Sequence, residues 1–317
     1  MNTTKKAKYF MISVDTEGDD QWDTSHPITT KNAAAVPRFQ ELCEAYGLKP
    51  VWLTDWEMAE DDNYVKFASR KQAQGLCEVG MHLHSWTTPP EYELQRKTDA
   101  REYLIECPIK IMEAKIASIT EKLTQTFGEA PVSHRSGRWA MDDRYFDLLV
   151  KYGYKVDCSV TPLVDWTDTL GATGAGGSDY KNANMHPSFI RKGLLEVPVT
   201  IRKLHYIQNG KIEGPYSWAR EMRNWVLGVN QWLRPFDLKS GKGMELLLCK
   251  MAAANEDVLF TLHSSELMPG TNQIFRTKED IDKLFVIMES VFSLATDLGY
   301  QGCTMREYYS AYEQSSK

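Results

Sequence analysis

Two histidines stand one residue apart in the stretch GMHLHSW, which covers residues 80–86. His82 and His84 share one face of an extended segment, because strand side chains alternate with a period of two. Asp15 and Glu17 have the same spacing, and two carboxylates that face one cleft repel unless a cation or a shared proton lies between them. Imidazoles with nearby carboxylates suit Zn²⁺ or a related divalent ion. An acid-rich turn and ordinary strand-end histidines need no metal, so each pair taken alone also allows a structural role.

Four further polar residues could take part in chemistry. Arg135 and Arg138, in HRSGRW, could orient a carboxylate or grip an anionic substrate, or they could form surface ion pairs. His263 follows the apolar run VLFTL and could be a general acid near neutral pH, or a structural histidine. Asp157 lies inside a run that reads as buried, where a carboxylate needs a partner.

The elements that must position these residues alternate between strand and helix. Apolar runs predict strands at 7–15, 49–55, 76–86, 130–139, 154–162, 194–201, 257–265 and 300–305, and periodic segments predict helices at 32–47, 63–75, 109–127, 141–153 and 278–299. This order predicts a parallel sheet with crossover helices. With about seven main strands, a closed or nearly closed α/β barrel is the leading architecture, and a doubly wound open sheet is the alternative. Ionisable groups finish five of the strands at the end where such folds bind ligands.

Two segments depart from the alternation. Residues 169–188 are rich in glycine and polar residues and predict a long loop, without the ending of a phosphate-binding loop. Residues 216–254 read as helical and carry Trp218, Trp225 and Trp232 at spacings of seven, which is typical of a core or an interface. That segment could form a homo-oligomer interface. We expect a single domain over residues 1–317 with a helical insertion at about 205–255.

Composition narrows the classes of partner and compartment. The 317 residues carry a net charge of −6, which argues against broad binding to a nucleic-acid backbone. No apolar run approaches the roughly 20 residues of a transmembrane helix, and the run Tyr9–Val14 is too short for the core of a signal peptide. We therefore expect a cytoplasmic protein. The six scattered cysteines predict reduced and mostly buried thiols.

Taken in chain order, five segments resemble the motifs of the polysaccharide deacetylases, carbohydrate esterase family 4. The segments are SVDTEGD, EVGMHLHSW, RSGRW, DCSVTP and TLHS, and together they run from about residue 9 to residue 265. Their wording looks closest to the branch found in lipopolysaccharide and capsule gene clusters. The resemblance implies an incomplete or irregular (β/α)7 barrel of the NodB-homology type. It also implies metal-assisted hydrolysis of an N-acyl amide on a sugar.

The resemblance also implies roles for individual residues. Asp15 would be the general base and Arg135 would hold it; His263 would protonate the leaving amine and pair with Asp157. His82 matches the first metal histidine of the family. Thr16 stands where the family has its second aspartate, so Glu17 is the natural replacement ligand, although Asp15 could equally be the ligand.

The second metal histidine usually lies four residues after the first. Trp86 occupies that place here, and His84 is the only substitute. Glu17, His82 and His84 would then hold a divalent metal, most naturally Zn²⁺, with Co²⁺, Mn²⁺ or Ni²⁺ as alternatives.

The leading hypothesis is a metal-dependent hydrolase that removes an acetyl or formyl group from a sugar intermediate of surface-polysaccharide synthesis. Its substrate would be a small nucleotide-linked or lipid-linked sugar, with Trp86, Arg138 and Trp139 as substrate-binding residues. Two alternatives remain. One is a metal-independent hydrolase of small ureido or formyl amides on the same fold, and the other is a non-catalytic sugar-binding protein.

Overall fold

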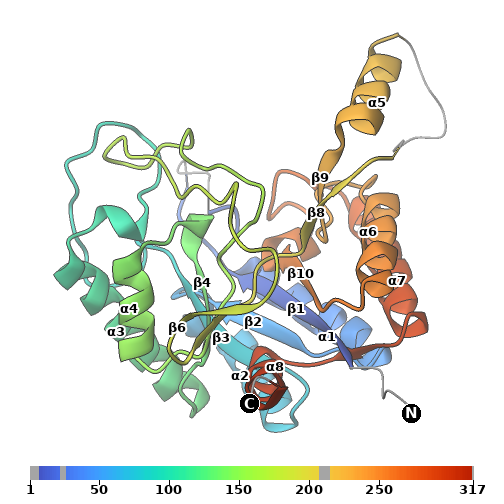
Figure 1. The fold of residues 1–317 in the computed structure, drawn as a ribbon. Coiled ribbons are helices and arrows are strands. Elements are labelled where there is room, and N and C mark those ends of the chain that lie inside the picture. Colours follow the sequence, from blue (N-terminus) through green and yellow to red (C-terminus); the bar gives the residue numbers. More distant parts are fainter. Residues whose placement is uncertain (1–6, 22–25, 207–214, 316–317) are drawn as a thin grey trace.

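A computed structural model describes residues 7–21, 26–206 and 215–315 of the chain (Figure 1). Its strands are β1 Lys8–Thr16, β2 Pro50–Thr54, β3 Glu78–Leu83, β4 Ser133–Ser136, β5 Val156–Asp157, β6 Ser188–Arg191, β7 Leu194–Glu196, β8 Ile201–Leu204, β9 Val229–Trp232, β10 Val258–His263 and β11 Tyr300–Gly302. Its α-helices are α1 Val36–Ala45, α2 Asp62–Ala73, α3 Ile109–Phe127, α4 Asp143–Lys151, α5 Pro215–Leu227, α6 Gly241–Ala253, α7 Lys278–Asp297 and α8 Met305–Ser315. Short 3₁₀ helices are η1 Lys31–Ala35, η2 Met58–Glu60, η3 Leu104–Glu106, η4 Gly137–Trp139 and η5 Ser264–Leu267.

The main sheet is parallel over most of its width and curls into an incomplete barrel. Its order is β10-β1-β2-β3-β4-β5-β7-β6, with β6 antiparallel to β7 and with β11 paired to β1. Helices α3 and α4 lie toward the left of the view and α6 and α7 toward the right (Figure 1), and the buried residues of all four helices pack in one cluster against the same face of the sheet. The predicted incomplete α/β barrel is confirmed, in preference to the open-sheet alternative. Since β1 to β4 run parallel, their carboxyl ends meet at one rim.

Leu233, in the β9–α6 connection, links the segment that follows β7 to strand β10. The backbone N–H of Leu233 donates to the carbonyl of Thr200, 2.9 Å away, and its carbonyl accepts from the N–H of Thr261 in β10, 3.2 Å away. Leu233 is itself fully buried. This pairing holds the next residue of the connection at the rim of the barrel.

Local sequence signals explain where the helices begin and end. Asp61 and Asp142 accept hydrogen bonds from the first turns of α2 and α4, and Thr277 caps α7. Helix α3 ends at Gly128, whose φ of 74° lies in the left-handed region that glycine adopts at low cost. Its apolar stripe faces the sheet, as the three- and four-residue spacing predicts.

The prediction of a helical segment at 216–254 is wrong in part. Strand β9 lies between α5 and α6 and pairs antiparallel with β8, so Trp232 belongs to a strand. Trp225 is 53% exposed on α5, which projects from the body of the molecule (Figure 1). The side chain of Trp218 lies outside the described residues. The regular tryptophan spacing therefore does not form one helical stripe.

The structure also describes the state of the cysteines and the apolar character of the helices. All six cysteines are free, and only Cys249 is exposed, as predicted. Within the described part of the chain, none of the helices combines the length and the apolar character that crossing a membrane requires.

Candidate metal centre and active site

The strand ends bring the predicted residues of four segments together. In the sheet, Asp15 of β1 is in register with His263 of β10, and His82 of β3 is in register with Arg135 of β4. Glu17 follows β1 and lies two residues beyond Asp15, so both carboxylates face the same side. Asp15 is 2% exposed and Glu17 is 4% exposed, so these charges lie within the protein.

Glu17 contacts both histidines of the opening motif. Its Oε2 lies 3.5 Å from Nε2 of His82 and 3.2 Å from Nε2 of His84. The two imidazole rings lie edge to face with their centroids 4.5 Å apart, and both are buried. Among the described residues, these three form the only His, Cys, Asp and Glu group whose ligand atoms lie close enough to hold a metal ion.

The hydrogen bonds of the two rings test whether a cation fits between them. Nδ1 of His82 lies 3.0 Å from the carbonyl oxygen of Arg135, which can only accept, so Nδ1 carries a hydrogen. In the neutral ring, Nε2 then turns a lone pair toward the Glu17 carboxylate, and these groups repel unless a cation or a proton lies between them. Burial lowers the pKa of His84, which favours its neutral form, and Nδ1 of His84 has no hydrogen-bond partner.

The donor set and its spacing also fit a tetrahedral divalent ion. Two ligand atoms bound to tetrahedral Zn²⁺ at ordinary bond lengths lie about 3.4 Å apart, close to the two distances between Glu17 and the imidazoles. The carbonyl held by His82 is the kind of outer partner that orients a ligating histidine. Burial would raise the pKa of Glu17, but the neighbouring His263, together with His82 and His84, holds that pKa well below its usual value.

Thr16 takes no part in this group. Its hydroxyl donates to the carbonyl of Val14, 2.9 Å away, and the residue is fully buried. Thr16 alternates in β1 with the two acids and so faces the other side of the strand. The structure thus places Glu17, and not the residue at the family's usual position, against the histidines. The ligand roles of Glu17, His82 and His84 remain predictions.

Arg135 holds Asp15 as the resemblance implies. Its Nη1 lies 2.5 Å from Oδ1 of Asp15, while its Nη2 donates to Ser13 and its Nε donates to the carbonyl of Cys158. Burial would raise the pKa of Asp15, but Arg135, together with His82 and His263, lowers it. Asp15 is therefore an ionised carboxylate with Oδ2 turned toward His263, whose Nε2 lies 3.4 Å away.

The partners of His263 differ from the prediction. Asp157 does not pair with it; Nδ1 of His263 lies 2.6 Å from Nη2 of Arg234 and 3.6 Å from Oε1 of Glu266. Glu266 also accepts from the backbone N–H of His263 through Oε2. Burial and Arg234 lower the pKa of His263, but Glu17 and Glu266 raise it more, so the net shift is upward.

Asp157 lies behind the rim and pairs with a different histidine. Its Oδ1 is 2.6 Å from Nδ1 of His134 and 2.7 Å from the hydroxyl of Ser159, and the opposite ring nitrogen of His134 meets the hydroxyl of Tyr145. All these groups are buried. The expectation that Asp157 needs a partner is correct, but the pair it forms connects strands β4 and β5 of the scaffold.

The three residues predicted to bind substrate have different surroundings. Trp86 stacks on the ring of His84 at 4.3 Å and donates to Gln21, 3.0 Å away, so it supports the histidine group. Trp139 packs against Arg135 and against Trp232. Their role toward a substrate remains a prediction.

Arg138 makes its described contacts with protein groups rather than with a cavity. It donates to the backbone carbonyls of Arg101 and Leu170 and lies over the ring of Tyr103. These contacts join loops, and the predicted role of Arg138 toward a substrate stays a prediction.

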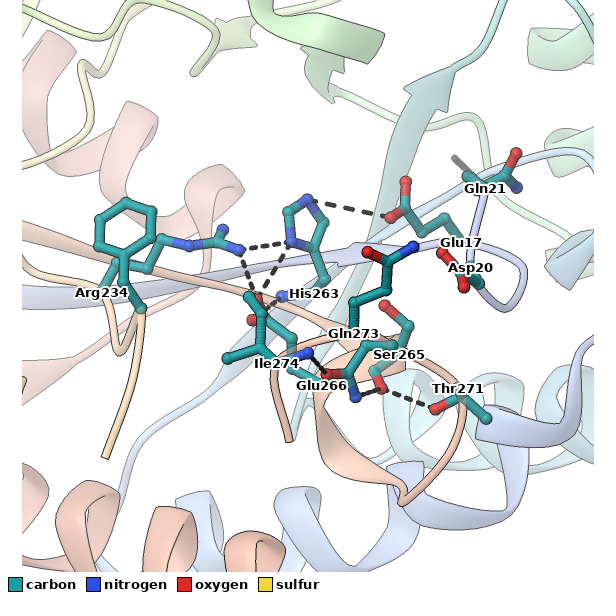
Figure 2. Close-up of a pocket in the computed structure, with 12 residues that line it drawn as sticks. Glu17, Asp20, Gln21, Arg234, His263, Ser265, Glu266, Thr271, Gln273 and Ile274 are labelled. Carbon is teal, nitrogen blue, oxygen red and sulfur yellow. Dashed lines mark hydrogen bonds and ion pairs between the residues drawn. The ribbon is translucent and has the colours of Figure 1, made fainter. Parts of the chain in front are cut away.

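A cavity of about 420 Å³ adjoins Glu17 and His263 (Figure 2). Arg234 and Glu266 also line it, and sequence reasoning missed both. Glu266 stands three residues after His263 in HSSE, a spacing that could have suggested a short-range partner. Arg234 carries no such signal, since it lies in the β9–α6 connection, 29 residues before the histidine.

Comparisons with known proteins bear on the fold. Neither a protein-family model nor a curated protein sequence matches this chain. Among solved structures, a protein assigned as a polysaccharide deacetylase from Mycobacterium smegmatis is similar with a TM-score of 0.53 and 12% identity, over 98% of this chain and 92% of that one. Puue allantoinase is similar with a TM-score of 0.52 and 12% identity, over 97% of this chain and 90% of that one. The chain therefore has the incomplete α/β barrel that these two proteins share.

Proposed function

We propose that this protein is a metal-dependent hydrolase that removes an N-acetyl or N-formyl group from a sugar intermediate of surface-polysaccharide synthesis. The observation that carries the proposal is the buried group of Glu17, His82 and His84, with Asp15 and His263 beside it. The similarity to a polysaccharide deacetylase supports the choice of reaction. A nucleotide-linked or lipid-linked sugar as substrate, and a cytoplasmic location, are parts of the same proposal.

Glu17, His82 and His84 would hold the ion, and Zn²⁺ is the ion that this donor set suits best. When bound, such an ion would activate the attacking water and polarise the acyl carbonyl. Three protein ligands would leave an open coordination position on a tetrahedral ion for the water or the acyl oxygen. The carbonyl of Arg135 keeps His82 in the tautomer that presents Nε2 to the ion.

Two residues of the chain would move the protons. Asp15 is ionised and held by Arg135, so its free Oδ2 can accept the proton of the attacking water. His263 lies 22% exposed beside the cavity, and its raised pKa favours the protonated ring; in that form its Nε2 can give a proton to the departing nitrogen and the ring is left neutral. The 3.4 Å between Oδ2 and Nε2 supports the assignment of acceptor and donor to one reacting group.

The direct test measures amine release from acylated nucleotide-linked and lipid-linked sugars by purified protein supplied with Zn²⁺, Co²⁺ or Mn²⁺. We expect turnover, and we expect Asp15→Asn to lower it by roughly a hundredfold or more, because general base catalysis contributes about that much. The matched control is Asp165→Asn in a surface loop, which should keep full activity. No amine release from any such sugar with any of these metals would contradict the proposal.

A second candidate is a metal-independent hydrolase of small amides. The similarity to Puue allantoinase and the two-residue spacing of His82 and His84 favour it. Elemental analysis separates the candidates: less than about a tenth of an equivalent of metal, with activity that survives a chelator, would favour the second. Loss of activity on chelation and its return with Zn²⁺ would favour the first.

A further inference from the structure

Arg234 is a buried arginine with unused hydrogen-bond donors. Its Nη2 lies 2.6 Å from Oε1 of Glu266 and 2.6 Å from Nδ1 of His263. Its Nε and Nη1 are buried and have no hydrogen-bond partner among the described residues. The side chain as a whole is only 5% exposed, so water does not cover these nitrogens.

Such an arrangement is unfavourable unless a partner is supplied. A guanidinium stays protonated at any ordinary pH and has no acceptor group. A buried charged donor without a partner loses its hydration and gains nothing in return. Glu266 balances the charge but engages only one of the three nitrogens, so the remaining donors point to an acceptor that the described residues do not supply.

The position of Arg234 suits a substrate group. Arg234 lines the 420 Å³ cavity, as Glu17 and His263 do (Figure 2). Among the described residues that line this cavity, Arg234 is the only arginine or lysine. Phe236 lies over the guanidinium, with its ring centre 5.1 Å from Cζ, and is 45% exposed.

The backbone holds Arg234 in this place. It directly follows Leu233, whose two backbone hydrogen bonds bridge Thr200 and Thr261. Two other arginines near the strand ends are engaged elsewhere, since Arg135 is used by Asp15 and its neighbours and Arg138 binds backbone carbonyls. Among the described residues that line the cavity, Arg234 is the arginine with buried donors that have no partner.

We infer that Arg234 binds a negatively charged substituent, a carboxylate or a phosphate, of the acylated sugar. The inference rests on the proposed function and names the class of its substrate: an acidic N-acyl sugar rather than a neutral one. Glu17 and Asp20 also line the cavity, so the anion belongs at the Arg234 end, next to His263. Charge-assisted hydrogen bonds of this kind are the strong ones in proteins.

The test compares three ligands by isothermal titration calorimetry on protein of measured metal content. N-acetylglucosamine is the neutral ligand, N-acetylglucosamine 1-phosphate carries the phosphate, and N-acetylglucosaminuronic acid carries the carboxylate. We expect at least one charged sugar to bind roughly ten- to a hundredfold tighter than the neutral sugar, as one or two charge-assisted hydrogen bonds would give. Equal binding of all three, or no binding of either charged sugar at millimolar concentration, overturns the inference.

Substitutions of Arg234 test whether this residue causes the tighter binding of the charged sugar. Arg234→Gln should remove the preference for the charged sugar at unchanged metal content, and Arg234→Lys should keep part of it. Arg191→Gln, at a surface arginine paired with Asp143 and Asp147, is the matched control and should keep all of it. A preference that persists in Arg234→Gln would place the anion at the metal and overturn the inference.

A double variant and a binding measurement without turnover separate the possible causes of a negative result. Arg234→Gln leaves Glu266 buried without its guanidinium partner, so the double variant Arg234→Gln/Glu266→Gln removes both charges if the single variant does not fold. Binding is measured without turnover. A preference without amine release would therefore reject the proposed function alone, and amine release without a preference would reject this inference alone.

Discussion

At the scale of the residue, the metal site that we propose depends on the contact of Glu17 with His82 and His84. Glu17 lies against both imidazoles, whereas its neighbour Thr16 turns to the opposite face and donates to Val14. An H-x-H pair on an extended segment presents both rings to one side. The closer spacing of His82 and His84 is accompanied by a longer carboxylate side chain, which reaches both rings.

The first prediction concerns this glutamate. Glu17→Ala should weaken Zn²⁺ binding by at least about a hundredfold, since loss of even an outer partner of a metal ligand costs ten- to a hundredfold. Thr16→Val is the matched control and should change the affinity less than about twofold, because its hydroxyl lies on the other face. Competition with a chelator measures both. Equal retention of Zn²⁺ by the two variants would show that Glu17 is no ligand.

At the scale of the element, the turn after β4 positions the second histidine. Gly137 begins η4, and a Cβ at this place would lie 2.5 Å from Cδ2 of His84 and 2.6 Å from the carbonyl of Leu83. The residue must therefore be small for the ring to approach Glu17. The geometry of the histidine pair thus depends on a loop that follows a neighbouring strand.

The second prediction uses this close approach. Gly137→Ala should displace His84, weaken Zn²⁺ binding by roughly tenfold, and lower the free energy of unfolding by about 1–3 kcal/mol through overpacking. Gly153→Ala is the matched control: its φ is 87° and nothing lies within 4 Å of the added Cβ. We expect it to lower stability by about 1 kcal/mol with no effect on the metal. Urea unfolding and metal titration measure both, and unaltered metal binding in Gly137→Ala would contradict the account of His84.

At the scale of the whole molecule, buried polar pairs join the strands behind the site. His134 and Asp157 connect β4 to β5 with a 2.6 Å contact, and Tyr145 of α4 joins them from outside the sheet. Burial lowers the pKa of His134 despite the opposing effect of Asp157. Burial would raise the pKa of Asp157, but the hydrogen bond and charge of His134 lower it.

The third prediction is a pH dependence of stability. The unfolded chain binds a proton at a histidine near pH 6.5, whereas folded His134 binds it only at lower pH, so the free energy of unfolding should fall as the pH drops below about 6.5. Asp157 adds a second loss below about pH 3.9, where the unfolded carboxylate takes up its proton first.

The variant His134→Asn separates this effect from those of the other histidines. It should reduce the loss of stability between pH 7.5 and 5.5, by at most about 1.4 kcal/mol per pH unit. His186→Asn, at a histidine whose side chain is 55% exposed, should leave the slope as in the natural chain. Urea unfolding at the two pH values measures it, and the same slope in all three proteins would contradict the role assigned to His134.

Much of the fold could be predicted because its signals are local. Alternating buried strands and amphipathic helices indicated a parallel α/β barrel, and the strand ends placed Asp15, His82, Arg135 and His263 at one rim. The segment at 216–254 could not be predicted in the same way. Strand β9 is held by its pairing with β8, which lies more than 20 residues earlier, and short apolar segments do not reveal their partners.

The sequence by itself determined which residues could do chemistry and at which end of the sheet they lie, because side-chain periodicity and parallel strand order are properties of the chain. Only the tertiary structure decided their partners. Asp157 met His134 instead of His263, and Glu266 and Arg234 took the places beside His263. The pairs Asp157–His134 and Arg234–His263 join residues 23 and 29 positions apart, and the second pair depends on the backbone link that Leu233 makes. Such contacts depend on how distant segments pack, and no local pattern in the sequence records that packing.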